Sequence, residues 1–590
     1  MPADLRRIPG VVDKRRRPSR PRQREVIAPW QPGPPRPPRS PRSPFVWELL
    51  AALRPRRKVV APRGPFPWTV AALTVGYIAL GLFVVNAFWS ATRVHVRADA
   101  IEDDAALTSG ALAERTVRFS VDPGERVDRA ELLLDGKPAS TKTYDIEGTE
   151  VVWKPGKLPE GKHEVELSVP RPMLGRSTFS WGFRVDDTPP RMDVPGLLPP
   201  SDLCKPVTIQ GKVERGATLT LDDKPLAHKN GAFTLRYDRA PTVPLRLAAT
   251  DRAGNRSQME VISPVRYPGG QGVHMTAVSW AYEPLRRDVL ALIDAGLVSA
   301  VELDLKDESG VVGYDSKVPL ALQIGAVQPE YSIKQTVSDL KRRGVRVIGR
   351  IVAFRDQPLV EWAWKNGKRD WVVQSADGAM LGTYGGFSNP AHPEVHRYNL
   401  EIALEATAAG VDDILWDYVR RPEGDPETMV FPGIQGSVSD ATVQFLATSR
   451  AALNERCAFQ GVSVFGIAAD RPDAVGQDVP RIARNVDYIA PMLYPSHWVP
   501  GEYRVKNPNQ QPYDIIKATL ADFQAKVAGT GAHLVPWLQD FSLGVTYGPA
   551  EVRAQIDAAA SLGVRDWLLW NAGVQYTAAA LDPSLVGLRR

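Results

Sequence analysis

Cysteine is scarce in this 590-residue chain, which has only Cys204 and Cys457. Neither belongs to a CxxC pair, and this excludes a thiolate metal site and a disulfide-dense scaffold. The two cysteines are 253 positions apart and fall in different predicted domains, so we expect no disulfide between them. Cys457 is expected to be a buried thiol.

Phosphate-binding and esterase motifs are also missing. No glycine-rich loop follows a predicted strand, and no GxxxxGK[ST] motif is found. Neither Ser279 nor Ser463 lies in a GxSxG elbow. These absences argue against dinucleotide-binding proteins, P-loop NTPases and esterases.

The net charge of +6 is unevenly distributed along the chain. Residues 1–63 contain 17 Lys and Arg but only 4 Asp and Glu, mixed with runs of proline. Removing these and Arg93 leaves 55 basic and 63 acidic residues in 94–590. The basic character therefore belongs to a tail that we expect to be disordered, and it gives no support for nucleic-acid binding by the globular part.

A long apolar segment follows the tail, with no charged residue from Gly64 to Thr92. Its length is sufficient for a transmembrane helix over 66–89, with Trp68 and Trp89 near the two ends. The basic residues before it place 1–63 in the cytoplasm and the rest of the chain outside. A signal peptide cut after Ala87 is the alternative to this single-pass anchor.

Two small all-β modules are predicted over 111–187 and 191–265. Short alternating strands separated by turns every 8–12 residues are typical of β-sandwiches. The segment from Asp251 to Asn255 resembles the D-x-A-G-N turn of bacterial immunoglobulin-like repeats. We interpret the modules as spacers, with carbohydrate or protein binding as the alternative.

From Gly272 onward, strand-like runs alternate with amphipathic helical segments, and several of these segments end in glycine before the next strand. Eight such units predict a (β/α)8 TIM barrel over 268–590, with a doubly wound sheet as the alternative. The expected strands are 272–280, 299–305, 345–354, 412–418, 461–469, 487–494, 532–541 and 566–571.

The second predicted strand carries three charges on one face. Alternation places Glu302, Asp304 and Lys306 together, and the apolar residues between them must face the helices. The charges are therefore expected inside the barrel, as part of a site or of a structural ion-pair network.

Further candidates stand where other strands end. Asp417 ends the fourth strand, and its alternative role is to cap the following loop. Asp470 follows the fifth strand, where a turn-forming role is the alternative. The remaining predicted substrate-binding residues around this rim are Arg350, Tyr494, His497, Trp537, Gln539 and Asn571. Carboxylates, amides and aromatic rings on one rim are typical of a sugar site.

Metal chemistry is not expected. His392 and His396 are four residues apart, but they follow Asn389 and Pro390 at a predicted helix start, and no third ligand accompanies them. We therefore predict no metal and no cofactor.

Six ordered motifs over 272–580 resemble those of a family of predicted glycoside hydrolases that is distantly similar to the α-amylase and α-galactosidase superfamilies. The motifs are ELDLKDESG (302–310), IGRIVAFRD (348–356), ILWDYVRRPEG (414–424), YIAPMLYPSHW (488–498), VPWLQDF (535–541) and WLLWNA (567–572). The resemblance implies that Asp417 is the nucleophile. The α-amylase-like acid is a glutamate on strand five, near which this chain has Asp470. The α-galactosidase-like acid follows strand six, where this chain has no carboxylate before Glu502.

We expect a membrane-anchored, extracytoplasmic glycosidase that acts on an envelope or extracellular polysaccharide. Asp417 is the expected nucleophile or charge stabiliser, Asp470 the acid/base and Asp304 the second choice for that role. The alternative is a non-catalytic carbohydrate-binding or wall-scaffold protein on a degenerate barrel. The distance between carboxyl groups at the rim distinguishes the two.

Overall fold

The computed structural model describes residues 68–91, 93–124, 127–171 and 175–582. The predicted tail 1–63 lies outside the described residues. The chain divides into two compact units, Met1–Ala91 and Thr92–Arg590, which are described separately here.

The first unit contains the helix α2 (Trp68–Ala91), which has no acidic residue in its first turn and no basic residue in its last. The segment Val70–Phe88 is long and apolar enough to cross a membrane, by length and composition. A signal sequence near an N-terminus meets the same criterion. The apolar helix expected over 66–89 is therefore present.

The second unit contains a closed barrel of eight parallel strands. Each strand pairs with its neighbours in chain order, and the first pairs with the last. The strands are β17 (Gln271–Met275), β18 (Ala300–Lys306), β21 (Arg346–Val352), β23 (Asp413–Asp417), β25 (Phe459–Phe465), β26 (Tyr488–Met492), β28 (Trp537–Gln539) and β29 (Trp567–Trp570). Closure through β17 excludes the doubly wound sheet.

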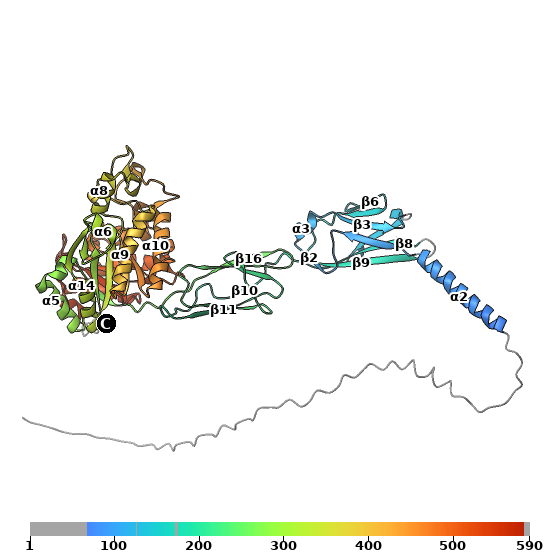
Figure 1. Cartoon of the computed structure of the whole chain (residues 1–590), viewed down its shortest axis with the longest axis horizontal. Coiled ribbons are helices and arrows are strands. Elements are labelled where there is room, and N and C mark those ends of the chain that lie inside the picture. The colour runs from blue at the N-terminus through green and yellow to red at the C-terminus, as the bar shows by residue number, and fades with distance from the viewer. Residues whose placement is uncertain (1–67, 92, 125–126, 172–174, 583–590) are drawn as a thin grey trace, which may run out of the picture. The chain divides into compact units, whose positions relative to one another are not determined.

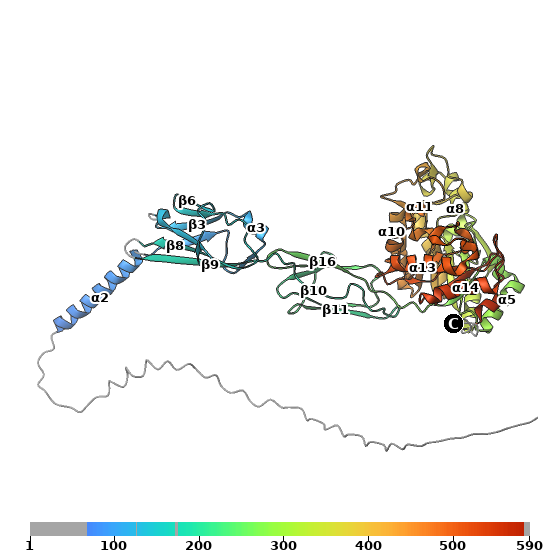
Figure 2. The ribbon, with the colours of Figure 1, turned by 180° about the vertical axis from the view of Figure 1, so that it is seen from behind.

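Helices cover the outside of the barrel, as both views of the ribbon show (Figure 1, Figure 2). Several amphipathic segments fold as expected, and Gly344 and Gly563 end two of them with φ of +74° and +79°, which favours glycine. The main covering helices are α5 (Glu283–Asp294), α7 (Ile333–Arg342), α8 (Gln357–Lys365), α9 (Pro393–Ala408), α10 (Val438–Glu455), α13 (Pro512–Val527) and α14 (Pro549–Ser561).

The strand-to-helix connections carry further short elements. The connection after β18 is the most elaborate, because β19 (Val312–Tyr314) pairs with the end of β18 and β20 (Val327–Tyr331) pairs with β19. Other short helices are α4 (Ala277–Ala281), α6 (Pro319–Gln323), α11 (Pro472–Val475), α12 (Val479–Ala483) and α15 (Ala578–Leu581). The expected first strand, 272–280, is too long, because its residues from Ala277 onward belong to α4.

The amino end of the barrel is closed by Tyr267. Its ring stacks on Tyr488 with centroids 4.5 Å apart, and its hydroxyl donates to Asp413 Oδ2 at 2.9 Å. Arg346 pairs with the same carboxylate. Asp413, Arg346 and the Tyr267 hydroxyl all have partners, whereas the Tyr488 hydroxyl is buried without one, so the charges in this plug are structural in character.

Two β modules precede the barrel, and each consists of two mainly antiparallel sheets. In the first module, residues of both sheets, including Phe119 and Phe183, share one buried core. The sheets are β1 (His95–Asp99), β3 (Val117–Asp122), β7 (Glu150–Trp153) and β6 (Tyr144–Glu147), and β2 (Ala105–Leu107), β9 (Arg176–Val185), β8 (Gly161–Pro170), β4 (Glu131–Leu134) and β5 (Lys137–Pro138). Strands β1 and β2 lie before residue 111, where we expected the module to begin.

The second module also has two sheets around one core, to which Ile209 and Leu247 contribute. The sheets are β10 (Met192–Asp193), β11 (Val207–Val213) and β14 (Ala232–Tyr237), and β13 (Lys224–Pro225), β12 (Thr218–Leu221), β15 (Leu245–Thr250) and β16 (Arg256–Val261). In the predicted turn, Asp251 Oδ1 accepts from the backbone of Gly254 and Asn255, and Asn255 Nδ2 donates to Asp186 O at 2.7 Å. This turn therefore ties the second module to the end of the first.

The expectation of two unpaired cysteines is wrong, because Cys204 and Cys457 form a disulfide with their Cα atoms 5.5 Å apart. The disulfide joins the second β module to the turn after α10. The separation of the two cysteines in the sequence could not reveal this contact. Arg239 Nη1 also donates to Asn454 O at 2.9 Å beside the bond. The second module and the barrel are thus covalently linked.

We predict that Cys204→Ser lowers the free energy of unfolding by about 2–4 kcal/mol, because the bond closes a long loop. Chemical denaturation of the full chain with and without reductant measures this loss. Reductant should destabilise the parent chain and leave the variant unchanged. Two titratable thiols in the denatured, unreduced parent would contradict the assignment.

Candidate active site

A cavity of about 520 Å³ opens where the barrel strands end. Side chains from β21, β23, β25, β26, β28 and β29 and from the loops that follow them line it. The polar lining residues are Glu308, Arg350, Asp417, Arg420, Glu423, Ser463, Gln477 and His497, and the aromatic ones are Tyr384, Tyr418, Phe465, Tyr494, Trp498, Trp537 and Trp570. The carboxyl ends of barrel strands are where this fold places its chemistry.

Arg350 is the centre of the site. Its guanidinium donates to Asp304 Oδ1 at 2.7 Å, to Asp417 Oδ2 at 2.7 and 2.9 Å, and to Glu308 through Nη2. Register explains part of this, because Asp304 is the partner of Arg350 across β18 and β21. One buried cation therefore holds three carboxylates.

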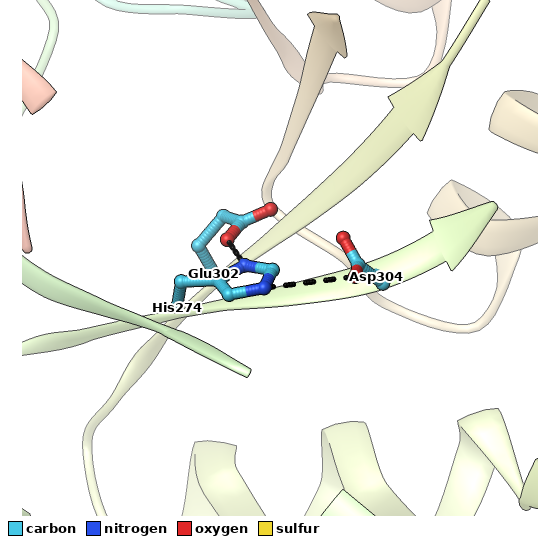
Figure 3. Close-up of side chains that lie close together, drawn as sticks. All are labelled: His274, Glu302 and Asp304. Atoms are coloured by element: carbon cyan, nitrogen blue, oxygen red, sulfur yellow. Dashed lines mark hydrogen bonds and ion pairs between the residues drawn. The ribbon is translucent and has the colours of Figure 1, made fainter. Parts of the chain in front are cut away.

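A histidine lies on the other side of Asp304. His274 on β17 contacts Glu302 through Nδ1, and its Nε2 faces Asp304 Oδ2 at 3.6 Å (Figure 3). The imidazole lies close to the indole of Trp570, with centroids 4.2 Å apart. The three side chains are at most 1% exposed, so the cluster lies beneath the cavity wall.

Burial and neighbouring charge compete in this cluster. Burial raises the pKa of Asp304, although Arg350 and His274 oppose the shift. Burial opposes a charged His274, but the Glu302 and Asp304 carboxylates outweigh it and raise its pKa. Burial also opposes an ionised Glu308, yet the charge and hydrogen bond of Arg350 lower its pKa to about 2.

The same cluster has atoms of the kinds that ligate metals. One such atom from each of His274, Glu302 and Asp304 lies within 4.8 Å of the others. The two carboxylates contact opposite nitrogens of one ring, and Arg350 holds Asp304. An ion at Nε2 would face Asp304 beside a guanidinium, and an ion at Nδ1 would displace Glu302. We therefore interpret the group as an ion-pair cluster.

Five of the predicted site residues line the cavity. They are Asp417, Arg350, Tyr494, His497 and Trp537. Trp537 is held in place by a hydrogen bond from Nε1 to Ser463 Oγ at 3.0 Å. Burial lowers the pKa of His497, which favours a neutral imidazole at the rim.

Other predicted residues lie elsewhere. Asp470 follows the short helix Gly466–Ala469, and its side chain is 59% exposed and paired with Arg471 at 3.3 Å. Gln539 accepts from Ser496 N and supports the loop after β26, while Asn571 bonds the backbone of its own turn. None of these three is among the lining residues of this cavity.

Lys306 does not share the face of Glu302 and Asp304. The pairing between β18 and β21 shifts register between Asp304 and Lys306, which is a β-bulge. Lys306 Nζ instead donates to Asp356 Oδ2 at 2.6 Å and Asn399 Oδ1 at 2.7 Å, against the helices. The expectation from strict alternation is therefore wrong at this residue.

Sequence reasoning missed several residues of the site, among them His274, Glu308 and Trp570. Glu308 and Trp570 lie inside motifs that we quoted, but we gave them no role. The signal for His274 was a polar residue within the apolar run GVHM, in a strand predicted to lie beside Glu302. His274 and Glu302 are in fact register partners.

The family model described as "Putative glycosyl hydrolase domain" matches residues 272–576. The chain belongs to this family, and the resemblance seen in its motifs is confirmed. No curated protein matches the chain.

Similar solved structures include the following three, all with TM-scores below 0.4. A hypothetical protein from Ruminiclostridium thermocellum ATCC 27405 is 27% identical, over 31% of this chain and 92% of that one, with a TM-score of 0.28. The glycoside hydrolase domain of PgaB (BpsB) from Bordetella bronchiseptica is 17% identical, over 54% and 98%, with a TM-score of 0.39. The Group IV chitinase of Ostrinia furnacalis is 13% identical, over 52% and 97%, with a TM-score of 0.34.

We predict that Arg350→Met lowers the free energy of unfolding by about 3–5 kcal/mol at pH 7, because buried carboxylates lose their cation. The difference from the parent should shrink in acid. Glu308 stabilises the parent above its ordinary pKa of 4.5, and this contribution is lost as the pH falls toward about 2.

Urea denaturation at several pH values, followed by tryptophan fluorescence, measures this difference. Arg471→Met is the matched control, because Arg471 is about half exposed and should change stability by about 1 kcal/mol or less. Equal effects of the two variants, or a difference that does not vary with pH, would contradict the role given to Arg350.

Proposed function

We propose that this chain is a membrane-anchored glycoside hydrolase that acts outside the cytoplasm on an envelope or extracellular polysaccharide. One observation carries the proposal: two carboxylates, Asp417 and Glu308, line an aromatic cavity and contact the same nitrogen, Arg350 Nη2. Family membership supports the reaction class.

The shared nitrogen limits the distance between the two carboxylates. Each accepts a hydrogen bond from Nη2, so the bonded oxygens lie within about two hydrogen-bond lengths, ~6 Å or less. Retaining glycosidases separate their carboxyl groups by about 5–5.5 Å, and inverting enzymes by about 6.5–9.5 Å. The pair therefore favours retention, with a covalent glycosyl-enzyme intermediate.

The roles follow from position. Asp417 ends β23, and we assign it as the nucleophile that attacks the anomeric carbon. Glu308 is the acid/base in place of Asp470, because it lines the cavity and Asp470 does not. Its side chain is 30% exposed, so a bound sugar would bury it further and raise its pKa toward the protonated form that an acid needs.

Asp304 has a different role in this proposal. Its oxygens face Arg350 and His274 rather than the cavity, so it holds the guanidinium in place. The partly exposed rings of Trp570 and Tyr494 offer faces for pyranose C–H surfaces, whereas Trp537 and Trp498 line the cavity but are only 1% and 6% exposed. A non-catalytic, carbohydrate-binding barrel is the alternative, and a lack of turnover on any polysaccharide together with binding would favour it.

Release of reducing ends from a panel of polysaccharides tests the activity. We predict that Asp417→Asn lowers turnover by more than about 10³-fold, because an amide cannot form the glycosyl ester. The melting temperature should change little, because Arg350 keeps Asp304 and Glu308 as partners. Asp470→Asn is the matched control and should retain full activity; the reverse result would return the catalytic role to Asp470.

The proposed location rests on α2 and on the disulfide. A helix long enough to span a membrane follows the basic residues of 1–63, and disulfides persist in oxidising compartments. We propose that the β modules are immunoglobulin-like spacers that hold the barrel away from the membrane.

We predict that protease added to intact cells digests the barrel and spares the arginine-rich segment. Antibodies against each end of the chain detect the products on a blot. A chain released into the medium and beginning near Ala87 would show instead that the apolar helix is a cleaved signal sequence. Protection of the barrel in intact cells would overturn the topology.

A further inference from the structure

The cluster beneath the cavity contains polar atoms without partners. Among the described residues, His274 Nε2, Glu302 Oε1 and Asp304 Oδ2 are buried and make no hydrogen bond. Two of them, Nε2 and Oδ2, face each other at 3.6 Å, as Figure 3 shows. Unsatisfied buried groups are costly, so an arrangement that places a proton between these atoms is favoured.

The position of that proton follows from the other contacts. Glu302 already accepts the proton on Nδ1, and Arg350 Nη1 holds the other oxygen of Asp304. A guanidinium stabilises the carboxylate form of Asp304, whereas imidazole is intrinsically the more basic group. The second proton therefore belongs on Nε2, which makes His274 an imidazolium between two carboxylates.

Charge in the cluster points the same way. Asp304, Glu308 and Asp417 pair with the guanidinium of Arg350, and Glu302 contacts His274. These four acids and Arg350 therefore have an excess of three negative charges when all are ionised. Among the described residues, no Lys or Arg other than Arg350 forms an ion pair with any of these four acids. An imidazolium reduces the excess within hydrogen-bond reach of two of them.

We infer that His274 is a positioning residue that bridges Glu302 and Asp304 as an imidazolium and, through Asp304 and Arg350, fixes the Asp417 carboxylate. The consequence for catalysis rests on the proposed function, but the charge state of His274 does not. Trp570 provides a second route to the cavity, because its indole lines the cavity and lies against the imidazole.

The groups that face His274 set the direction of its pH dependence. They are Glu302 and Asp304 from β18 and Arg350 from β21, and the hydroxyl of Tyr576 donates to the backbone oxygen of His274. The carboxylates outweigh burial and Arg350, so the pKa of His274 lies above 6.5. The imidazolium is thus the main form below pH 6.5 and is lost as the pH rises through the raised pKa.

The direct test is NMR of the full chain labelled with [13Cε1]histidine, titrated from pH 5 to 9. The chain has eight histidines, and single substitutions of the other seven identify the His274 signal by elimination. His396 is the internal control, because burial lowers its pKa and its Nε2 bonds the Pro390 carbonyl oxygen rather than a carboxylate. We expect the His274 signal to titrate above pH 6.5 and the His396 signal below it.

Turnover gives the second test. We expect His274→Gln to lower kcat/KM by about 10²-fold at pH 6, because misplaced catalytic groups cost this much. The fall in kcat/KM of the parent at alkaline pH should be reduced in the variant. His95→Gln, on an exposed strand position of the first β module, should match the parent throughout.

Three results would overturn the inference. The first is a neutral His274 with one protonated nitrogen from pH 5 to 7, which would place the proton on Asp304. The second is a change of the His274 signal on adding Zn²⁺ to the chelator-treated chain, together with a rise in melting temperature, which would make the cluster a metal site. The third is a His274→Gln variant with the pH profile of the parent. A titrating imidazolium in a chain without turnover would instead contradict only the proposed function.

Discussion

The site depends on a single buried guanidinium. Arg350 is 3% exposed and contacts Asp304, Glu308 and Asp417. Taking such charges out of water costs several kcal/mol per ion, and only good geometry with complete hydrogen bonding offsets the cost. The barrel supplies that geometry, because register pairs Asp304 with Arg350 on adjacent parallel strands, Asp417 ends the next strand, and the loop after β18 adds Glu308.

The same two strands carry a second cluster, which differs from the first in charge balance and in accessibility. Arg346 and Asp413 lie four residues before Arg350 and Asp417, at the amino end of the barrel. There one carboxylate meets one guanidinium, and Tyr267 covers both. At the carboxyl end three carboxylates share one guanidinium beside an open cavity. A balanced, covered pair stabilises the fold, whereas an unbalanced, accessible cluster costs stability and is typical of a site.

The spacing of apolar residues predicted the barrel well, because continuous apolar runs indicate its strands and a helical repeat of apolar residues indicates its helices. It also placed Glu302 and Asp304 correctly inside the barrel. It could not predict the bulge that turns Lys306 outward, since a one-residue register change leaves no mark in an apolar pattern. The disulfide was missed for a related reason: Cys204 and Cys457 meet only because the second β module contacts the barrel domain at the end of α10. Asp470 shows that position in the sequence alone does not identify a site residue. It follows the fifth strand as predicted, but its side chain points to solvent.

The excess of negative charge has a consequence for the reaction itself. An oxocarbenium-like transition state is positive, so a cavity floor with more carboxylates than cations stabilises it relative to the neutral sugar. That excess must nevertheless be tolerated when the cavity is empty, and water does not reach the buried part of the cluster. Protons held by buried groups reduce this negative charge, because they lie next to the carboxylates without occupying the cavity. The features that make the site costly in the free protein are thus the ones that give it an advantage during catalysis.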